Sequence, residues 1–248
     1  MAWGKPRRRI CIARWRTTCL LSAAGLALSF PLQAPAGTEL PPRWHLFFGG
    51  DSAAESMFGH AGLVWAPVDD LHQTGWRLRA IAGGGEFAYL SGSTRISGRL
   101  LTAAVMPGFE WIGDDAGVTI YGGATVQDQT TRPHDPGKSR QGTRFGAKAR
   151  IEGWFRPTSD VVLNGSGSYA TAAESYTARI SANVALSPHF ALEPEMAAFG
   201  EPGYDQQRYG LLVEYRHDRQ LTLKLGGGWA IEPDDDGPYV AFQVKTWR

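Results

Sequence analysis

The chain has 248 residues, of which 43% are hydrophobic and 20% are charged, and its formal net charge is +1. This hydrophobic content excludes a mostly disordered chain. A mean hydropathy of −0.25 excludes a bundle of membrane-spanning helices.

The first 36 residues contain six basic residues and no acidic residue. An apolar run from Leu20 to Leu32 follows the basic start, and Ala34 and Ala36 follow the run. This order is typical of a cleavable secretory signal peptide. A membrane anchor is the alternative, but the run is too short to span a bilayer of about 30 Å. We therefore expect residues 1–36 to be a signal peptide and residues 37–248 to be the mature protein.

Cleavage after residue 36 changes the charge of the chain. It removes six of the 25 basic residues, none of the 24 acidic residues and both cysteines, Cys11 and Cys19. The remaining 212 residues have a net charge of −5 and no thiol. An exported chain without cysteines is not a disulfide-stapled domain, and an acidic one is a poor candidate for nucleic-acid binding. No glycine-rich phosphate loop or cysteine-based metal site occurs, so we expect no cofactor and no metal.

Alternation of apolar and polar residues dominates the mature chain. Apolar or aromatic residues occupy every second position from Tyr176 to Leu186, and polar residues such as Arg179 lie between them. A period of two predicts a strand with one apolar and one polar face. The pattern recurs between turn sequences and predicts twelve strands, at residues 44–51, 57–66, 75–87, 95–111, 116–128, 143–156, 161–172, 176–186, 190–199, 205–216, 221–230 and 238–247.

The connections between these strands indicate a barrel. One set of connections is mostly short, whereas the other contains the longest, Gln129 to Gly142, and the most acidic, Glu232 to Gly237. Such asymmetry is typical of outer-membrane barrels, and strands near ten residues suit tilted membrane crossings. We therefore predict an all-β fold, a single antiparallel up-and-down transmembrane β-barrel of about twelve strands over residues 37–248. The alternative is a soluble β-sandwich or lipocalin-like barrel.

Aromatic residues gather near the predicted strand ends, as expected for girdles at the two membrane interfaces. They are Trp44, Trp65, Trp76, Trp111, Trp154, Phe155, Tyr169, Tyr176, Tyr209, Tyr215, Trp229 and Tyr239. Many outer-membrane barrels end on an aromatic residue that the assembly machinery reads. Here Trp247 is penultimate and has the opposite parity from Phe242 and Val244.

A series of short segments runs in order along the chain. It includes Phe48-Gly49-Gly50-Asp51, Gly62-Leu63-Val64-Trp65, Trp154-Phe155-Arg156-Pro157-Thr158 and Tyr204-Asp205-Gln206-Gln207-Arg208. Over about residues 45–247 the chain thereby resembles the cellulose biosynthesis protein BcsS family. The resemblance implies an exported outer-membrane protein tied to bacterial cellulose production, with cellulose or other components of the secretion system as partners. The family brings no established catalytic residues.

The best candidate for a catalytic site is Ser56 with His60, near Asp51 and Glu55. Two residues four apart on a strand share a face but lie about 13 Å apart. That distance is too long for the hydrogen bond between a nucleophile and its base. His134 falls in the longest loop, where a solvated histidine is expected. No G-x-S-x-G or H-E-x-x-H motif occurs, so we expect no enzymatic activity and no catalytic residues.

Two acidic groups are candidate binding or catalytic sites. The carboxylates Glu232, Asp234, Asp235 and Asp236 could bind calcium, but their spacing favours a solvated acidic loop. Glu193 and Glu195 share one strand face and could do acid–base chemistry. Neutralisation of lumen arginines on the next strand, such as Arg208, is the favoured interpretation.

Together these patterns predict a non-catalytic accessory protein of bacterial cellulose biosynthesis, export or surface anchoring. Its loops would meet glucan or secretion partners, and its outer face would meet outer-membrane lipid. The alternatives are an outer-membrane barrel enzyme acting on lipid or polysaccharide and a narrow porin for small solutes. Long charged side chains in a twelve-stranded lumen argue against a wide glucan pore.

Overall fold

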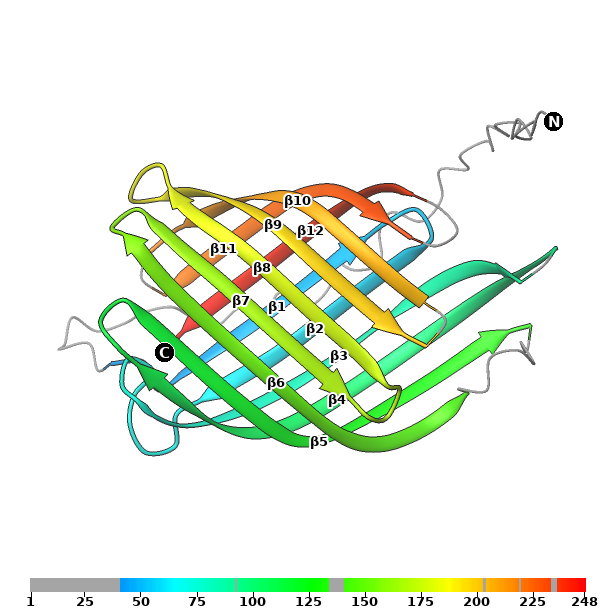
Figure 1. Cartoon of the computed structure of the whole chain (residues 1–248), viewed down its shortest axis with the longest axis horizontal. Helices are drawn as coiled ribbons and strands as arrows, with labels where there is room; N and C mark the ends of the chain where they lie inside the picture. The colour runs from blue at the N-terminus through cyan, green and yellow to red at the C-terminus, as the bar shows by residue number, and fades with distance from the viewer. Residues whose placement is uncertain (1–40, 92, 134–140, 203, 219, 233–235) are drawn as a thin grey trace, which may run out of the picture. The chain divides into compact units, whose positions relative to one another are not determined.

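The computed structural model describes residues 41–91, 93–133, 141–202, 204–218, 220–232 and 236–248. This part of the chain forms twelve antiparallel strands, each paired with its sequence neighbours, and β1 pairs with β12 to close the barrel (Figure 1). The strands are β1 (Trp44–Ser52), β2 (Ser56–Trp65), β3 (Gly75–Ser91), β4 (Thr94–Ile112), β5 (Ala116–Arg132), β6 (Gly142–Thr158), β7 (Val161–Ala170), β8 (Ser175–Ala185), β9 (Phe190–Glu201), β10 (Tyr204–Arg216), β11 (Leu221–Ile231) and β12 (Gly237–Trp247).

All twelve predicted strands are confirmed, with ends that shift by at most four residues. The largest shifts extend β3 to Ser91 and β5 to Arg132. Residues 129–132 are polar and were expected to be loop, but they pair with residues 97–100 of β4. Backbone pairing with a neighbouring strand therefore outweighs their polar composition.

The expected difference between short and long connections is wrong. At the end where β1 begins and β12 ends, which we call the terminus end, the β2–β3 connection spans residues 66–74. At the opposite end, which we call the distal end, the β5–β6 connection spans residues 133–141 and has the same length as the β2–β3 connection. The two ends differ instead in strand length, because β3 to β6 have 17 to 19 residues and project beyond the other strands at the distal end (Figure 1).

The barrel has a polar interior and an apolar outer surface. Ile180 at the centre of β8 is 60% exposed, whereas Arg77 inside the barrel is 1% exposed. Each of the twelve strands carries at least two exposed large apolar residues. A soluble sandwich or lipocalin-like barrel has an apolar interior and a polar surface. The structure therefore supports the predicted transmembrane barrel over the soluble alternative.

Most of the predicted aromatic girdle faces outward. Exposed members are Trp65, Trp76, Trp111, Phe155, Tyr169, Tyr176, Tyr209 and Trp229. The prediction is wrong for Tyr239, which is buried in the lumen, and for Trp154, which lines a lumen cavity. Both lie on the polar parity of their strands, so their position near a strand end does not place them in a girdle.

Glycines make room for the inward Tyr239. In the strand register, Tyr239 faces Gly228, Gly228 faces Gly210 and Gly210 faces Glu195. A Cβ atom on Gly210 would collide with the Tyr239 hydroxyl. The tyrosine therefore lies over two glycines and donates a hydrogen bond to Glu195 Oε1 at 3.2 Å. None of the described segments is a helix long and apolar enough to cross a membrane.

Candidate functional site: the charged lumen

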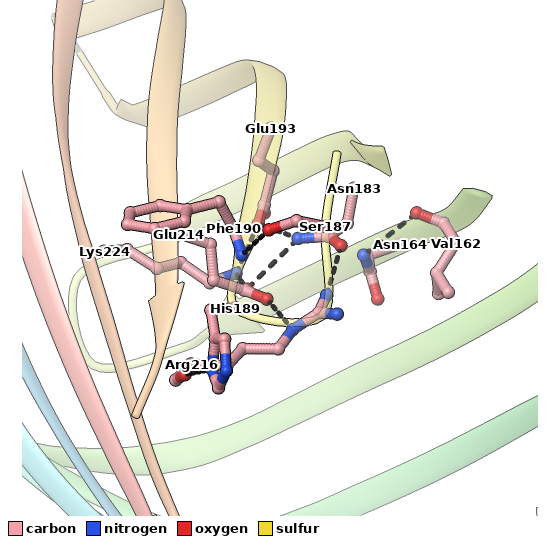
Figure 2. A network of polar contacts seen from close by, with 10 residues as sticks. All are labelled: Val162, Asn164, Asn183, Ser187, His189, Phe190, Glu193, Glu214, Arg216 and Lys224. Carbon is pink, nitrogen blue, oxygen red and sulfur yellow. Dashed lines mark hydrogen bonds and ion pairs between the residues drawn. The ribbon is translucent and has the colours of Figure 1, made fainter. Parts of the chain in front are cut away.

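The lumen side chains of β8 to β11 form a balanced network near the terminus end (Figure 2). Glu193 and Glu214 are 5% and 6% exposed. Lys224 bridges them, contacting Glu193 and lying 3.2 Å from Glu214 Oε2. Asn183 donates to both carboxylates, at 3.3 and 3.1 Å, and Arg216 pairs with Glu214 at 2.6 Å. Two cations thus match two buried carboxylates, as burial of charge requires.

A second group of charges lies on β3, β4 and β6. Arg77 pairs with Glu110 at 2.6 Å. Glu152 accepts contacts from two arginines, Arg79 at 3.1 Å and Arg150 at 2.6 Å. Because Arg79 is on β3 and Glu152 on β6, this pair spans two intervening strands along the lumen wall.

A third group connects β10 to β1. Arg208 pairs with Asp51 at 2.6 Å, across two intervening strands. Its guanidinium carbon lies 5.2 Å from the ring centroid of Phe199 and 5.0 Å from that of Tyr239. Cation–π contacts of this kind add to the ion pair in holding the arginine.

The prediction that Glu193 and Glu195 neutralise Arg208 is wrong, although Glu195 does face a lumen arginine of the neighbouring strand β8. Glu193 contacts Lys224, and Glu195 lies 3.6 Å from Arg179, whereas Arg208 pairs with Asp51. Inside a narrow barrel, long side chains reach strands that are not neighbours. Register on the adjacent strand therefore does not fix the ion pairs.

A cavity of 560 Å³, which we call the vestibule, occupies the lumen toward the terminus end. Its lining extends from Gly113 and Asp114 in the β4–β5 turn to Arg179 on β8. Charged lining residues are Glu110, Asp114, Arg150, Glu152, Arg156, Arg179 and Lys245. A volume of this size falls within the range of small-molecule sites.

The aromatic residue near the chain end, Trp247, lines the vestibule. Its ring lies 4.7 Å from that of His45, and Lys245 Nζ lies 3.8 Å from its centroid. It also packs on Val64 and Leu71, which belong to a small buried cluster. The parity noted in the sequence is thereby confirmed, because Trp247 faces the lumen while Phe242 is exposed outside.

The residues considered for catalysis do not form a triad. Ser56 and His60 pair with Phe87 and Gly83 of β3, so they lie four positions apart on a regular strand. The nearby acids have other partners: Asp51 pairs with Arg208, and Glu55 pairs with Arg95 at 2.5 Å.

Some of the candidate residues lie outside the described part of the chain, namely His134, Asp234 and Asp235. In the same acidic connection, Asp236 Oδ1 accepts a hydrogen bond from the Glu232 amide at 3.2 Å, and the Glu232 side chain contacts Gln206. Sequence reasoning passed over Lys245. The alternation in β12 could have identified Lys245 as a lumen residue, because Lys245 lies two residues before Trp247 and therefore on the same face of the strand.

Solved structures with a similar fold are outer-membrane barrel proteins. The Pseudomonas putida toluene transporter TodX aligns with a TM-score of 0.50 and 10% identity, covering 86% of this chain and 90% of its own. A TodX deletion mutant gives a TM-score of 0.53 and 9% identity, covering 84% and 91%. The translocator domain of the Neisseria meningitidis autotransporter NalP gives 0.50 and 9%, covering 85% and 90%. At such identities the likeness concerns the fold alone.

The family comparison is more specific than the structural one. None of the curated proteins compared matches this chain. The family model for the cellulose biosynthesis protein BcsS matches residues 45–248, which include all of the barrel strands except the first residue of β1. The chain therefore belongs to the BcsS family.

Proposed function

We propose that the mature chain inserts into the outer membrane after cleavage near residue 36 and acts as a non-catalytic accessory in cellulose export or surface anchoring. The observation that carries this proposal is the apolar outer surface of a closed barrel in a BcsS-family chain. Exposed apolar residues on every strand are stable in lipid and costly in water. The buried arginines and carboxylates require the polar lumen that such a barrel provides.

Bridges across the lumen favour an accessory role over a wide glucan pore. Arg79 joins β3 to β6, Arg208 joins β10 to β1, and Tyr239 joins β12 to β9. Bonds between strands that are not neighbours occupy the lumen. Opening a glucan-wide passage would break several buried ion pairs, which is costly.

The distal end is the surface that we propose for glucan or secretion partners. The hairpins β3–β4 and β5–β6 project there beyond the other strands (Figure 1). They take the place of the long outer loops of other outer-membrane barrels. Connections on a rigid scaffold usually carry recognition.

Deleting the gene tests this role. Extracellular cellulose, measured by dye binding and by cellulase-sensitive aggregation, is expected to decrease or to be mislocalised. Synthase activity measured in isolated cytoplasmic membranes is expected to stay unchanged, because an outer-membrane barrel does not contact the cytoplasmic substrate. Complementation with the wild-type gene is the control. Normal extracellular cellulose in the deletion strain, or loss of synthase activity, contradicts the proposal.

A further inference from the structure

One part of the lumen has more cations than carboxylates can neutralise. Arg79 and Arg150 share Glu152. Among the described residues, no carboxylate lies within ion-pair distance of Lys148 or Lys245. Four cations therefore depend on one carboxylate.

The surroundings of the two lysines do not remove this excess. The charged groups that act on Lys148 are Arg79 and Arg150, both cations. Lys245 experiences Glu152 and the cation Arg79, together with Glu110 and Lys224 from further around the lumen. Glu110 is already held by an ion pair with Arg77.

Hydrogen-bond donors are also in excess in this group. Arg79 is 8% exposed, and its Nε atom is buried without a hydrogen-bond acceptor in the described structure. Leaving a buried donor unpaired carries a desolvation cost. The network of Figure 2 lies in the same lumen and is balanced, with both of its carboxylates matched by cations. The excess is therefore local to the Glu152 group.

This group borders an open space. Arg150, Glu152 and Lys245 all line the vestibule, and Arg179 lines it from β8. Arg179 lies 3.6 Å from Glu195, a separation longer than a hydrogen bond. The Arg179 guanidinium therefore makes no short hydrogen bond to Glu195, and its N–H groups can donate to another oxygen.

We propose that the vestibule binds a small ligand through a carboxylate or phosphate group, held by Lys245, Arg150 and Arg179. Such a group supplies the oxygens that these donors lack, and charge-assisted hydrogen bonds to it are short and strong. Lys148 adds positive potential from the same face of β6. The ligand is a free anion or a sugar that carries an acidic group, and the site is independent of the proposed role in cellulose export.

The aromatic lining favours an anion over a neutral sugar. Lys245 covers one face of Trp247, and Arg156 lies 5.5 Å from the ring centroid of Trp154. Each of these cations lies over one face of its ring, where a neutral sugar would otherwise stack. The lining therefore favours a ligand that is recognised mainly by its charge.

Calorimetric titration of the folded mature protein in detergent micelles tests the site. The probes are inorganic phosphate, cellobionate as an acidic disaccharide, and cellobiose as its neutral counterpart. The variant Lys148→Gln/Lys245→Gln is expected to weaken anion binding about tenfold or more. Lys245→Arg in an otherwise wild-type chain should retain most of the affinity, because the positive charge is kept. The control Arg95→Gln removes one positive charge from an exposed pair at the distal end and should change affinity less than about twofold.

Each outcome of the titration supports or overturns the site. Binding of phosphate, competed by cellobionate and lost in the double lysine variant, supports a site for a free anion. Binding of cellobionate alone, with the same dependence on the lysines, supports an acidic sugar as the source. Equal binding of cellobiose, no binding of either anion, or equal loss in Arg95→Gln overturns the proposal. Heat-modifiable gel mobility checks that each variant is folded, and none of these results bears on the deletion phenotype.

Discussion

At the scale of single residues, the direction of a side chain determines its environment. Arg179 and Ile180 are neighbours in β8, yet Arg179 faces Glu195 in the lumen and Ile180 is exposed outside. Successive side chains on a strand point to opposite faces. A substitution on one face therefore meets lipid, while the same substitution on the other meets charge.

Ile180→Arg tests this assignment. Ile180 is the central residue of β8, so arginine there is expected to cost roughly 2–4 kcal/mol of folding free energy in a bilayer. Ser181→Arg is the matched control, because Ser181 faces the lumen and contacts Glu193 at 2.8 Å. Urea unfolding in lipid vesicles gives both values. An equal or larger loss for Ser181→Arg would show that the register is wrong by one residue.

Lys224→Met tests the buried network of Figure 2. The substitution leaves Glu193 without its cation, so we expect a loss of roughly 3–5 kcal/mol. Adding Glu193→Gln removes the unpaired charge and is expected to recover a large part of that loss. Unfolding free energies of the two single variants and the double variant form a mutant cycle. Additive losses in that cycle would show that the two side chains do not interact.

At the scale of elements, the longest strands explain where the barrel can meet partners. Strands β3 to β6 continue past the other strands because their polar ends still pair, as Gln129 does with Leu100 and Arg132 with Ser97. Paired backbone keeps such hairpins ordered even where the sequence is polar. The distal ends of these strands are thus held beyond the rim.

Shortening the distal connections tests their role. Replacing residues 133–141 with a short turn should leave membrane insertion unchanged, because both flanking strands stay paired in the barrel. Retention of cellulose at the cell surface is expected to fall, as measured by dye binding on intact cells. The same change to residues 232–236 provides a second, independent test.

Two results would contradict a role for these connections. If both replacements retain normal cellulose, the distal end is not the recognition surface. If His60→Ala alone abolishes the phenotype in a folded barrel, a catalytic barrel becomes the better explanation.

At the level of the whole molecule, closure gives each of the twelve described strands a paired neighbour on both sides. The pairing of β1 with β12 continues to the chain end, where the Arg248 amide donates to the Trp44 carbonyl at 2.8 Å. In lipid, unpaired backbone groups are costly, so a closed barrel is a stable way for strands to cross. Closure also requires all twelve strands at once, which makes the barrel one cooperative unit.

The predicted location follows from this closure and from the outer surface. The mature protein is expected to fractionate with outer membranes and to migrate faster on gels before boiling than after it. The closed hydrogen-bonded barrel resists detergent until heated, whereas the heated chain unfolds. Cell fractionation and gels of boiled and unboiled samples measure both properties. Recovery as a soluble periplasmic protein would contradict the transmembrane assignment.

The strands, the faces of their side chains and the family could all be predicted from the amino-acid sequence. Period-two alternation depends only on local chain geometry, so the strand at 176–186 and the inward parity of Trp247 could be predicted from it. The resemblance to the BcsS family rested on short segments in order, and the family match confirms it.

Which lumen charges meet could not be predicted from the sequence. Arg208 reaches Asp51 across two strands, and Lys245 stays without a carboxylate partner among the described residues. These outcomes depend on barrel closure, which brings together residues far apart in the chain. They also depend on side-chain length relative to the lumen, and local sequence patterns report neither quantity. The vestibule was unpredictable for the same reason, since it is the space that those side chains leave unfilled.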